Sequence, residues 1–371
     1  MTSVSIIISC FNYERFVGDA IASALGQQHP GTEVIVVDDG STDRSAAVIG
    51  AHSGRVTALS QPNSGQAAAL NAGYAASRGD AVLFLDADDV LLPGAAAALS
   101  RVLAGAEIAK AHWSMPVIDA AGERTGEIQD PELPEGDLRS YAIEHGPLSD
   151  MTMPSPPMSG NAFARWYLRR VMPVPAEHYR TGADEYLFGL APAFGPIARL
   201  ESQSLYRIHG RNDHLGQSFE ERLAFQERHN EIIAEVVARE CGVGDADAWR
   251  RHSWWMRAGR VACRIEAAVP AGERVALIDQ GALGIDADLR GRTVVPFPDA
   301  CGQFAGVPES DVAARAELEH LAGHGVGYVA VAWPAYWWLE EYPSLARALR
   351  ARPALGESDD VMLFGPAEER T

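Results

Sequence analysis

The sequence predicts an α/β fold built around a mostly parallel sheet, and three observations support this prediction. Short apolar runs at residues 4–9, 33–37 and 81–85 have the length and composition of strands that are buried on both faces. Segments with apolar residues at helical spacing separate these runs, so strands and helices alternate along the chain. Polar and acidic residues follow each run directly, at the end of the strands where open α/β sheets bind their ligands.

The run at residues 81–85 leads into the sequence Asp86, Ala87, Asp88 and Asp89. In an extended chain residues i and i+2 point the same way, so Asp86 and Asp88 are expected to project together while Ala87 points aside. Two close carboxylates repel each other unless a cation lies between them, and such oxygen ligands suit Mg²⁺ or Mn²⁺. The alternative is that Asp88 or Asp89 caps the helix that begins near residue 93.

Two further runs end in polar residues. The run at residues 4–9 leads into residues 10–14, and the run at residues 33–37 leads into Asp38 and Asp39. A single acidic loop is usually a solvated turn. Acids that end two strands of one parallel sheet more often mark a ligand site, because a bound cation or a hydrogen-bonding ligand must offset their repulsion.

Composition excludes several classes of function. The chain has 371 residues and a formal net charge of −19, which argues against a nucleic-acid partner because phosphate binding needs clustered Lys and Arg. Lys110 is the single lysine, so no lysine is available for a phosphate-binding P-loop. The four cysteines are scattered, and neither a signal peptide nor an apolar run long enough to span a bilayer is expected. We therefore expect a cytoplasmic protein.

Three regions are predicted from the change of pattern along the chain. Residues 1–215 form the α/β domain described above, residues 216–269 a helical linker, and residues 270–371 a small C-terminal α/β domain. Within the first region, residues 108–118 are expected to form one strand, and residues 159–163 to open a helix. The linker carries tryptophans interleaved with arginines. Packing against the next domain and peripheral contact with an anionic membrane surface both stay open as explanations.

Several of these segments, taken together, resemble the family 2 glycosyltransferases of GT-A fold. The segments are SIIISCFNYERFVGDAIASALGQ, EVIVVDDGSTD and NSGQAAALNAGYAASRGDAVLFLDADD, in that order and spacing. The similarity is strong over residues 3–115 and weaker up to residue 212. It implies a GT-A fold with a Rossmann-like sheet, an inverting transfer of a hexose-type sugar, and a divalent metal bound by a DxD motif.

The resemblance also implies roles for individual residues. The resemblance implies that the first loop and the acidic turns contact the donor nucleotide. In this assignment Asp39 contacts the base and Asp86 faces the ribose. It assigns the metal to Asp88, with Asp86 and His209 close to it. The donor-binding residues that the resemblance implies are Ser9, Phe11, Asn12, Glu14, Asp39, Gly65, Asn71, Asp86 and Ala87.

A second acidic pair, Asp184 and Glu185, resembles the family's Glu-Asp motif, whose carboxylate takes the proton from the acceptor hydroxyl. The order of the two acids is reversed here, and we favour Asp184 as the base. Acids at a helix N-terminus also stabilise the helix dipole, so a structural role is compatible with this one. The sequence YRIHGRN at residues 206–212 resembles the family's closing segment and places His209 near the diphosphate or the metal.

The predicted function is a non-processive glycosyltransferase that moves a sugar from a UDP-, dTDP- or GDP-sugar to a carbohydrate or glycoconjugate acceptor, as in bacterial polysaccharide biosynthesis. The QxxRW motif of the processive synthases is absent, because Ala162 stands where its glutamine is expected before Arg165 and Trp166. Two alternatives are a nucleotide-sugar-binding module and a nucleotidyltransferase on a related sheet. The second would need a basic, glycine-rich loop after the first strand, which residues 10–14 do not provide.

Overall fold

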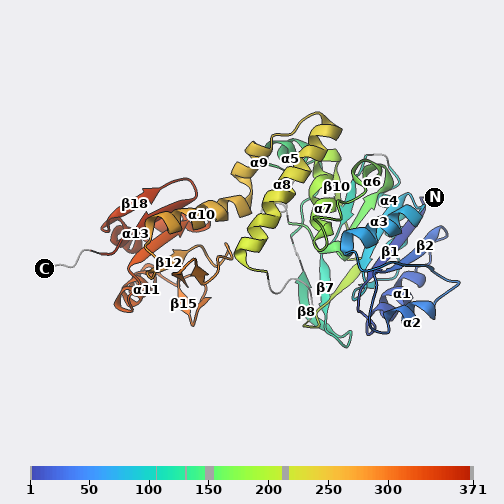
Figure 1. The fold of residues 1–371 in the computed structure, drawn as a ribbon, viewed down its shortest axis with the longest axis horizontal. Coiled ribbons are helices and arrows are strands. Elements are labelled where there is room, and N and C mark those ends of the chain that lie inside the picture. Colours follow the sequence, from blue (N-terminus) through green and yellow to red (C-terminus); the bar gives the residue numbers. More distant parts are fainter. Residues whose placement is uncertain (1, 106, 130–131, 147–153, 211–216, 368–371) are drawn as a thin grey trace. The chain divides into compact units, whose positions relative to one another are not determined.

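The computed structural model describes residues 2–105, 107–129, 132–146, 154–210 and 217–367 (Figure 1). The chain divides into two compact units, and each is described by itself. The first unit comprises Met1–Gly216 and Glu227–Ser253, and the second comprises Gln217–Gln226 and Trp254–Thr371. The predicted domain boundaries after residues 215 and 269 concern which parts of the chain fold independently, and they stay a prediction.

The first unit alternates strands and helices. In chain order its elements are β1 (Val4–Cys10), α1 (Val17–Leu25), β2 (Thr32–Asp38), α2 (Ser45–Gly50), β3 (Thr57–Ser60), α3 (Gln66–Ala76), β4 (Ala81–Asp86), β5 (Val90–Leu91), α4 (Ala95–Val102), β6 (Lys110–His112), β7 (Met115–Ile118), β8 (Arg124–Gln129), α5 (Arg139–His145), the 3₁₀ turn η1 (Met158–Gly160), β9 (Asn161–Ala164), α6 (Arg165–Val171), α7 (Ala183–Phe194), β10 (Ile197–Arg199), β11 (Ser204–Arg207), α8 (Phe219–Cys241) and α9 (Ala246–His252). The first turns of α8 belong to the second unit.

A seven-stranded sheet forms the centre of this unit, in the order β10-β6-β9-β4-β1-β2-β3. The pairs β1/β2, β1/β4, β2/β3 and β6/β10 are parallel, and β9 is antiparallel to both β4 and β6. A smaller sheet has the order β5-β11-β7-β8. The predicted α/β class with a mostly parallel sheet is therefore confirmed.

Helices cover both faces of the large sheet. Alternate residues of β1, among them Ile6 and Ile8, belong to one fully buried cluster with apolar side chains of α1 and α4. On the other face α3 lies against β1 and β2 so closely that a side chain at Gly73 would clash with Ile7. A sheet buried on both faces explains why β1, β2 and β4 appear in the sequence as unbroken apolar runs.

Two local predictions within this unit are wrong. Residues 161–164 form strand β9 in place of a helix start, and the helix begins only at Arg165. Residues 108–118 form two strands, β6 and β7, which belong to different sheets. In both places the apolar segment is too short for its period to distinguish a strand from a helix or one strand from two.

The second unit has its own sheet and core. Its further elements are α10 (Trp254–Ala268), β12 (Arg274–Ile278), β13 (Asp288–Leu289), β14 (Arg292–Pro296), β15 (Asp299–Ala300), β16 (Gln303–Phe304), α11 (Asp311–Gly323), β17 (Tyr328–Ala332), the 3₁₀ turn η2 (Trp333–Ala335), α12 (Trp338–Glu341), α13 (Pro343–Arg350), β18 (Ala354–Glu357) and β19 (Val361–Phe364). A six-stranded sheet has the order β13-β14-β12-β17-β19-β18, and β15 pairs with β16. The predicted α/β pattern of this part of the chain is confirmed.

The basic, aromatic helix α10 uses several of its side chains inside the second unit. Arg257 Nε and Arg260 Nε donate hydrogen bonds to the two carboxylate oxygens of Asp360, at 2.7 and 2.6 Å. Trp254 meets Trp333 edge to face, with ring centroids 4.9 Å apart. Contact of this helix with a membrane surface stays a prediction. Across the described part of the chain, no helix combines the length and apolarity that crossing a bilayer requires.

The single lysine lies inside the first unit. Lys110, on β6, is 2% exposed, and its Nζ donates a hydrogen bond to Ser155 Oγ at 2.8 Å. Its ammonium group lies 5.4 Å from the centroid of the Phe188 ring on α7. Burial lowers the pKa of Lys110 to about 7, because it removes water from the ammonium group. Lys110 is therefore a structural residue with an unfavourable charge.

The first prediction concerns the pH dependence of stability. The pKa of Lys110 is lowered from 10.5 to about 7 in the folded protein, so the unfolded chain binds one more proton between these values. Stability should fall as the pH drops through this window, by up to about 1.4 kcal/mol per pH unit. Lys110→Met should lack this dependence and gain most over the wild type near pH 7. Urea unfolding of both proteins from pH 7.5 to 9.5 measures it, and parallel curves would show that folded Lys110 stays charged.

Candidate active site

The predicted convergence of three strand ends is present in the structure. Parallel pairing sets Ser9 of β1 beside both Val37 of β2 and Asp86 of β4. The loops that follow these strands therefore begin at one edge of the sheet, in a crevice position typical of ligand sites in α/β proteins. Ser9 is half-buried, and the side chain of Phe11 is exposed at this edge.

Asn12 and Glu14 join the loop after β1 to the loop after β2. Asn12 adopts a left-handed conformation, with φ of 62°, and its Oδ1 accepts hydrogen bonds from the backbone N–H groups of Thr42 and Asp43, at 2.7 and 3.3 Å. Glu14 Oε2 accepts the backbone N–H of Arg44 at 2.9 Å. These side chains therefore shape the predicted nucleotide loop. Their direct contact with a nucleotide stays a prediction.

Asp39 is buried and holds the turn that precedes α3. Its Oδ1 accepts hydrogen bonds from Gln61 Nε2 at 2.7 Å and from the backbone N–H of Ser64 at 2.9 Å. Its Oδ2 accepts the backbone N–H of Gly65 at 2.8 Å. Both oxygens of the acid predicted to meet the base thus already accept hydrogen bonds, and this fixes the wall of the candidate nucleotide site.

The start of α3 is covered by the segment that leads to the second acidic pair. Gly65 has φ of +90°, and a Cβ there would lie 2.8 Å from Arg180 Cα. The backbone N–H of Gln66 donates to the carbonyl oxygen of Arg180 at 2.8 Å. Asn71 forms two hydrogen bonds of 2.8 Å with the backbone N–H and carbonyl of Val174. Both predicted donor-site residues of this helix, Gly65 and Asn71, therefore anchor residues 174–180.

The acids after β4 form a tight turn, in which the backbone N–H of Asp89 donates to the carbonyl oxygen of Asp86 at 3.2 Å. Ser159 Oγ accepts the backbone N–H of Asp86 at 2.9 Å. Asp88 is buried, and its Oδ2 lies 2.9 Å from His209 Nε2. Burial raises the pKa of Asp88, while the hydrogen bond with His209 acts in the opposite direction. The structure thus brings together the three residues predicted to be near the metal.

Ala87 and Asp89 point away from solvent. Ala87 is 2% exposed and belongs to the apolar cluster beneath the sheet, as expected for the residue between the two projecting acids. Asp89 is 1% exposed, and its Oδ2 has no hydrogen-bond partner within the part of the chain that the structure describes. Burial and the carboxylates of Asp88 and Asp86 raise the pKa of Asp89 well above its ordinary value.

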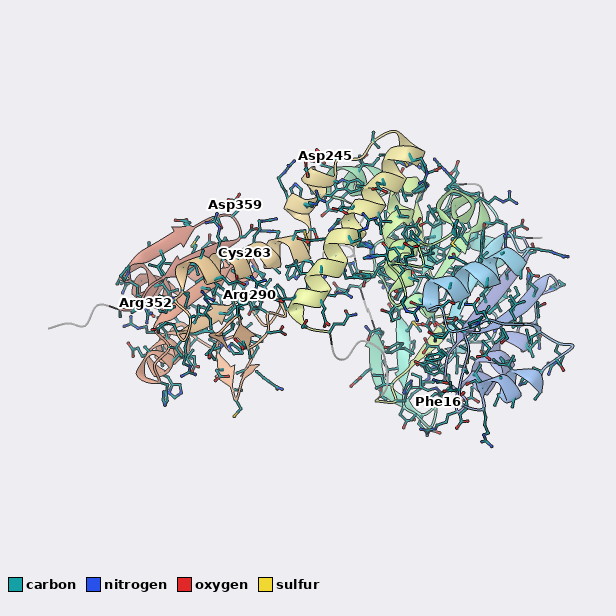
Figure 2. The ribbon with its side chains drawn as sticks, viewed as in Figure 1. Phe16, Asp245, Cys263, Arg290, Arg352 and Asp359 are labelled. Atoms are coloured by element: carbon teal, nitrogen blue, oxygen red, sulfur yellow. The ribbon has the colours of Figure 1, made fainter. Side chains whose placement is uncertain are left out.

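Arg207 contacts this turn and Phe16 packs against Arg207 and His209, and sequence reasoning assigned no role at the site to either. Arg207 Nε donates to the carbonyl oxygen of Asp88 at 2.7 Å, and its backbone N–H donates to Asp89 Oδ1 at 2.8 Å. The Phe16 ring, labelled in Figure 2, lies 5.0 Å beneath the guanidinium and stacks on His209 at 4.7 Å. The signal available in the sequence was the position of Arg207 two residues before His209.

The second acidic pair lies in the first turn of α7. Gly182 precedes the helix in a left-handed conformation, and the backbone N–H of Ala183 donates to Gln66 Oε1 at 3.0 Å. Glu185 is 8% exposed, whereas Asp184 is half-buried. Adjacent side chains on a helix point about 100° apart, so the two acids face different surroundings. The greater exposure of Asp184 favours it as the acid that meets an acceptor.

These residues fit a divalent metal that is bound partly by the protein and partly by the substrate. Mg²⁺ is commonly bound by one or two carboxylates together with substrate phosphates. Within the described ranges no group of three or more His, Cys, Asp and Glu side chains is arranged to hold a metal by itself. Among the residues that the structure describes, the buried Asp89 Oδ2 has no hydrogen-bond partner, so a polar atom of this turn is left unsatisfied. Asp88 and Asp86 are the residues that would hold the ion, and the role of His209 as a direct ligand stays a prediction.

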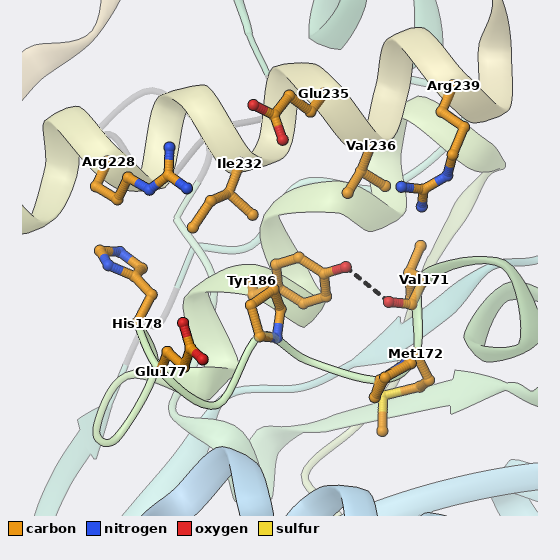
Figure 3. A pocket seen from close by; sticks show the side chains of 12 residues that line it. Val171, Met172, Glu177, His178, Tyr186, Arg228, Ile232, Glu235, Val236 and Arg239 are labelled. Atoms are coloured by element: carbon orange, nitrogen blue, oxygen red, sulfur yellow. Dashed lines mark hydrogen bonds between the residues drawn. The ribbon is translucent and has the colours of Figure 1, made fainter.

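A separate pocket of about 490 Å³ lies between α8 and residues 171–178 (Figure 3). Arg228, Glu235 and Arg239 reach toward it from α8, and Tyr186 of α7 lies at its centre with its hydroxyl donating to the carbonyl oxygen of Val171. None of the predicted site residues lines this pocket. The candidate active site is therefore the strand-end edge and not this pocket.

Comparison with known proteins supports the resemblance for the first part of the chain. Residues 5–161 match the family model described as glycosyl transferase family 2. An uncharacterized glycosyltransferase of Nostoc sp. is 36% identical over 219 residues, which are 57% of this chain and 66% of the relative. The succinoglycan biosynthesis protein ExoU of Rhizobium meliloti is 43% identical over 97 residues, which are 25% of this chain and 28% of the relative.

The chain thus spans less than two thirds of the length of these curated relatives. Among solved structures, Staphylococcus aureus TarS 1-349 in complex with UDP-GlcNAc aligns with 71% of this chain and 85% of its own, at 16% identity and a TM-score of 0.43. That score is too low for the ligand of TarS to say anything about this chain. The predicted similarity to family 2 glycosyltransferases is confirmed for residues 5–161. The DxD assignment and the inverting mechanism stay predictions.

The second prediction tests the close approach between α3 and the segment that covers it. Gly65→Ala adds a Cβ 2.8 Å from Arg180 Cα at φ of +90°, whereas Gly94→Ala adds one at φ of +91° with nothing within 4 Å. Both variants carry the cost of a left-handed alanine, so Gly65→Ala should be less stable than Gly94→Ala by about 1–3 kcal/mol. Urea unfolding measures the difference. Equal stabilities would show that the segment moves aside without cost.

Proposed function

We propose that this protein is a non-processive glycosyltransferase that moves a sugar from a nucleotide-diphosphate donor to a hydroxyl group of an acceptor. The observation that carries the proposal is that the family match over residues 5–161 includes all three strand-end loops, which parallel pairing brings to one edge. One relative is a succinoglycan biosynthesis protein, which supports a carbohydrate or glycoconjugate acceptor. A UDP-, dTDP- or GDP-sugar as donor and a cytoplasmic location stay predictions.

In this proposal, different residues of the chain bind the donor and accept the proton. The loop containing Phe11 and Asn12, with Asp39 behind it, would hold the nucleotide, and Asp86 would face the ribose. Asp88 would hold a divalent metal, which when bound neutralises charge on the leaving diphosphate. Ser159 Oγ donates to the carboxylate of Asp86 at 3.4 Å and His209 binds the carboxylate of Asp88, so both carboxylates are oriented before the donor arrives.

Asp184 would take the proton from the acceptor hydroxyl as its oxygen attacks the anomeric carbon. The bond to the diphosphate breaks as the new glycosidic bond forms, so a single displacement inverts the anomeric centre. The position of Asp184 depends on α3, because Gln66 accepts the backbone N–H of the residue before it. The base is therefore held by the same helix that borders the donor site.

The third prediction tests the function itself. Purified protein is incubated with UDP-, dTDP- and GDP-sugars and Mn²⁺, and release of the nucleoside diphosphate is measured with and without EDTA. Release should occur with one donor class and stop with EDTA. Asp88→Ala should lower the rate by about 10²-fold or more, the scale of a lost electrostatic stabiliser. Asp80→Ala, at the opposite end of β4, is the control and should keep the rate.

Two outcomes would contradict this reading. Full activity of Asp88→Ala would exclude Asp88 as the metal ligand. Nucleotide-sugar binding without any release of nucleoside diphosphate, with or without acceptor glycans, would indicate a binding module instead of an enzyme.

The fourth prediction concerns the proton. Asp184→Asn keeps the shape of the side chain but removes the base, so acceptor-dependent kcat should fall by about 10²-fold or more while the Kd for the nucleotide is unchanged. Glu185→Gln should have a milder effect, because Glu185 is buried and its side chain points about 100° away from that of Asp184 on the helix. Calorimetry and kcat measurements on both variants decide between them. A dead Glu185→Gln with an active Asp184→Asn would shift the assignment by one residue.

A further inference from the structure

We propose that Arg207 is a positioning residue, which holds the turn at residues 86–89 so that Asp88 presents its carboxylate to the metal–diphosphate of the donor. The proposal rests on the proposed function, because it concerns the same site. Arg207 does not touch the donor in this assignment and acts through Asp88 and Asp89.

Two groups of Arg207 bind two consecutive residues of the turn. Its Nε donates to the carbonyl oxygen of Asp88 at 2.7 Å, and its backbone N–H donates to Asp89 Oδ1 at 2.8 Å. His209 binds the side chain of Asp88 at the same time, at 2.9 Å from Oδ2. Asp88 is therefore held at its main chain by Arg207 of β11 and at its carboxylate by His209.

The guanidinium is itself fixed from other directions. Arg207 is 2% exposed, its Nη2 donates to Asp19 Oδ2 at 3.1 Å, and its planar group lies over the Phe16 ring at 5.0 Å. Strand β11 also pairs with β5, which follows the turn directly, through Ser204 and Leu91. The buried guanidinium of Arg207 thus joins the turn at residues 86–89, α1 and β11.

These contacts need an arginine. A guanidinium offers donors in several directions within one plane and stacks on an aromatic ring, whereas a lysine ammonium is a point charge on a flexible stem. Lysine at this position would keep the positive charge but not the combination of the bond to Asp88, the bond to Asp19 and the stacking on Phe16. Partners that orient a metal ligand typically change metal affinity by about 10- to 100-fold when they are removed.

The fifth prediction follows from this requirement. In Arg207→Lys the Kd for Mn²⁺, measured by electron paramagnetic resonance with UDP, dTDP and GDP as probes, should rise about 10-fold or more. The Mn²⁺ concentration that half-saturates donor turnover should rise in parallel, more than the KM for the donor. The matched control is Arg352→Lys, labelled in Figure 2, another buried arginine whose Nη1 donates to the Gly327 carbonyl at 2.7 Å. It should leave the Kd for Mn²⁺ unchanged.

Thermal unfolding in EDTA separates positioning from a merely structural role. A structural role would lower the Tm of Arg207→Lys while the folded protein binds Mn²⁺ normally, and that result overturns the proposal. If Arg207→Lys does not fold, Asp19→Ala removes the exposed carboxylate that fixes the guanidinium of Arg207. An unchanged Kd for Mn²⁺ in that variant also overturns the proposal. A wild type that binds no Mn²⁺ with any of the three nucleotides overturns both this proposal and the proposed metal-dependent transfer.

Discussion

Several acids, among them Asp39, Asp88 and Asp89, are buried where β2 and β4 end, and a buried carboxylate is unfavourable unless hydrogen-bond donors or cations surround it. The carboxylate of Asp39 obtains its donors from the turn before α3, that of Asp88 from His209, and that of Asp89 from the backbone of β11. These donors lie far from the acids in the sequence, in the turn before α3 and in residues 207–209. Satisfying these carboxylates therefore fixes the loops around them, and the geometry of the whole edge depends on this.

Helix α3 connects the proposed donor side of the site with the proposed base side. Asn71 binds both backbone groups of Val174, and Gln66 binds the backbone at the start of α7. Helix α3 thus borders the nucleotide loop at its N-terminus and carries the segment that ends in Asp184. A change in α3 would shift both the proposed donor site and the proposed base. A glycine is required just before the helix because a Cβ at Gly65 would lie 2.8 Å from Arg180 Cα.

Much of the fold could be predicted from local pattern. The apolar runs of β1, β2 and β4 are long enough to be recognised as buried strands, and the acids that end them follow directly in the sequence. Strand β9 could not be predicted, because Asn161–Ala164 is a short segment without a diagnostic period. It forms a strand because β4 and β6 leave an antiparallel position between them, which only the assembled sheet provides.

By itself the sequence determined which chemical groups stand at the edge of the sheet, because the order of strand and acid is a local property of the chain. The tertiary structure decided which partners those groups meet. Arg207 lies 118 positions from Asp89 and Val174 lies 103 positions from Asn71, and no local period relates residues at such separations. The sequence predicted Asp39, Gly65 and Asn71 as site residues, whereas their roles in holding loops became visible only once the distant segments were folded against them.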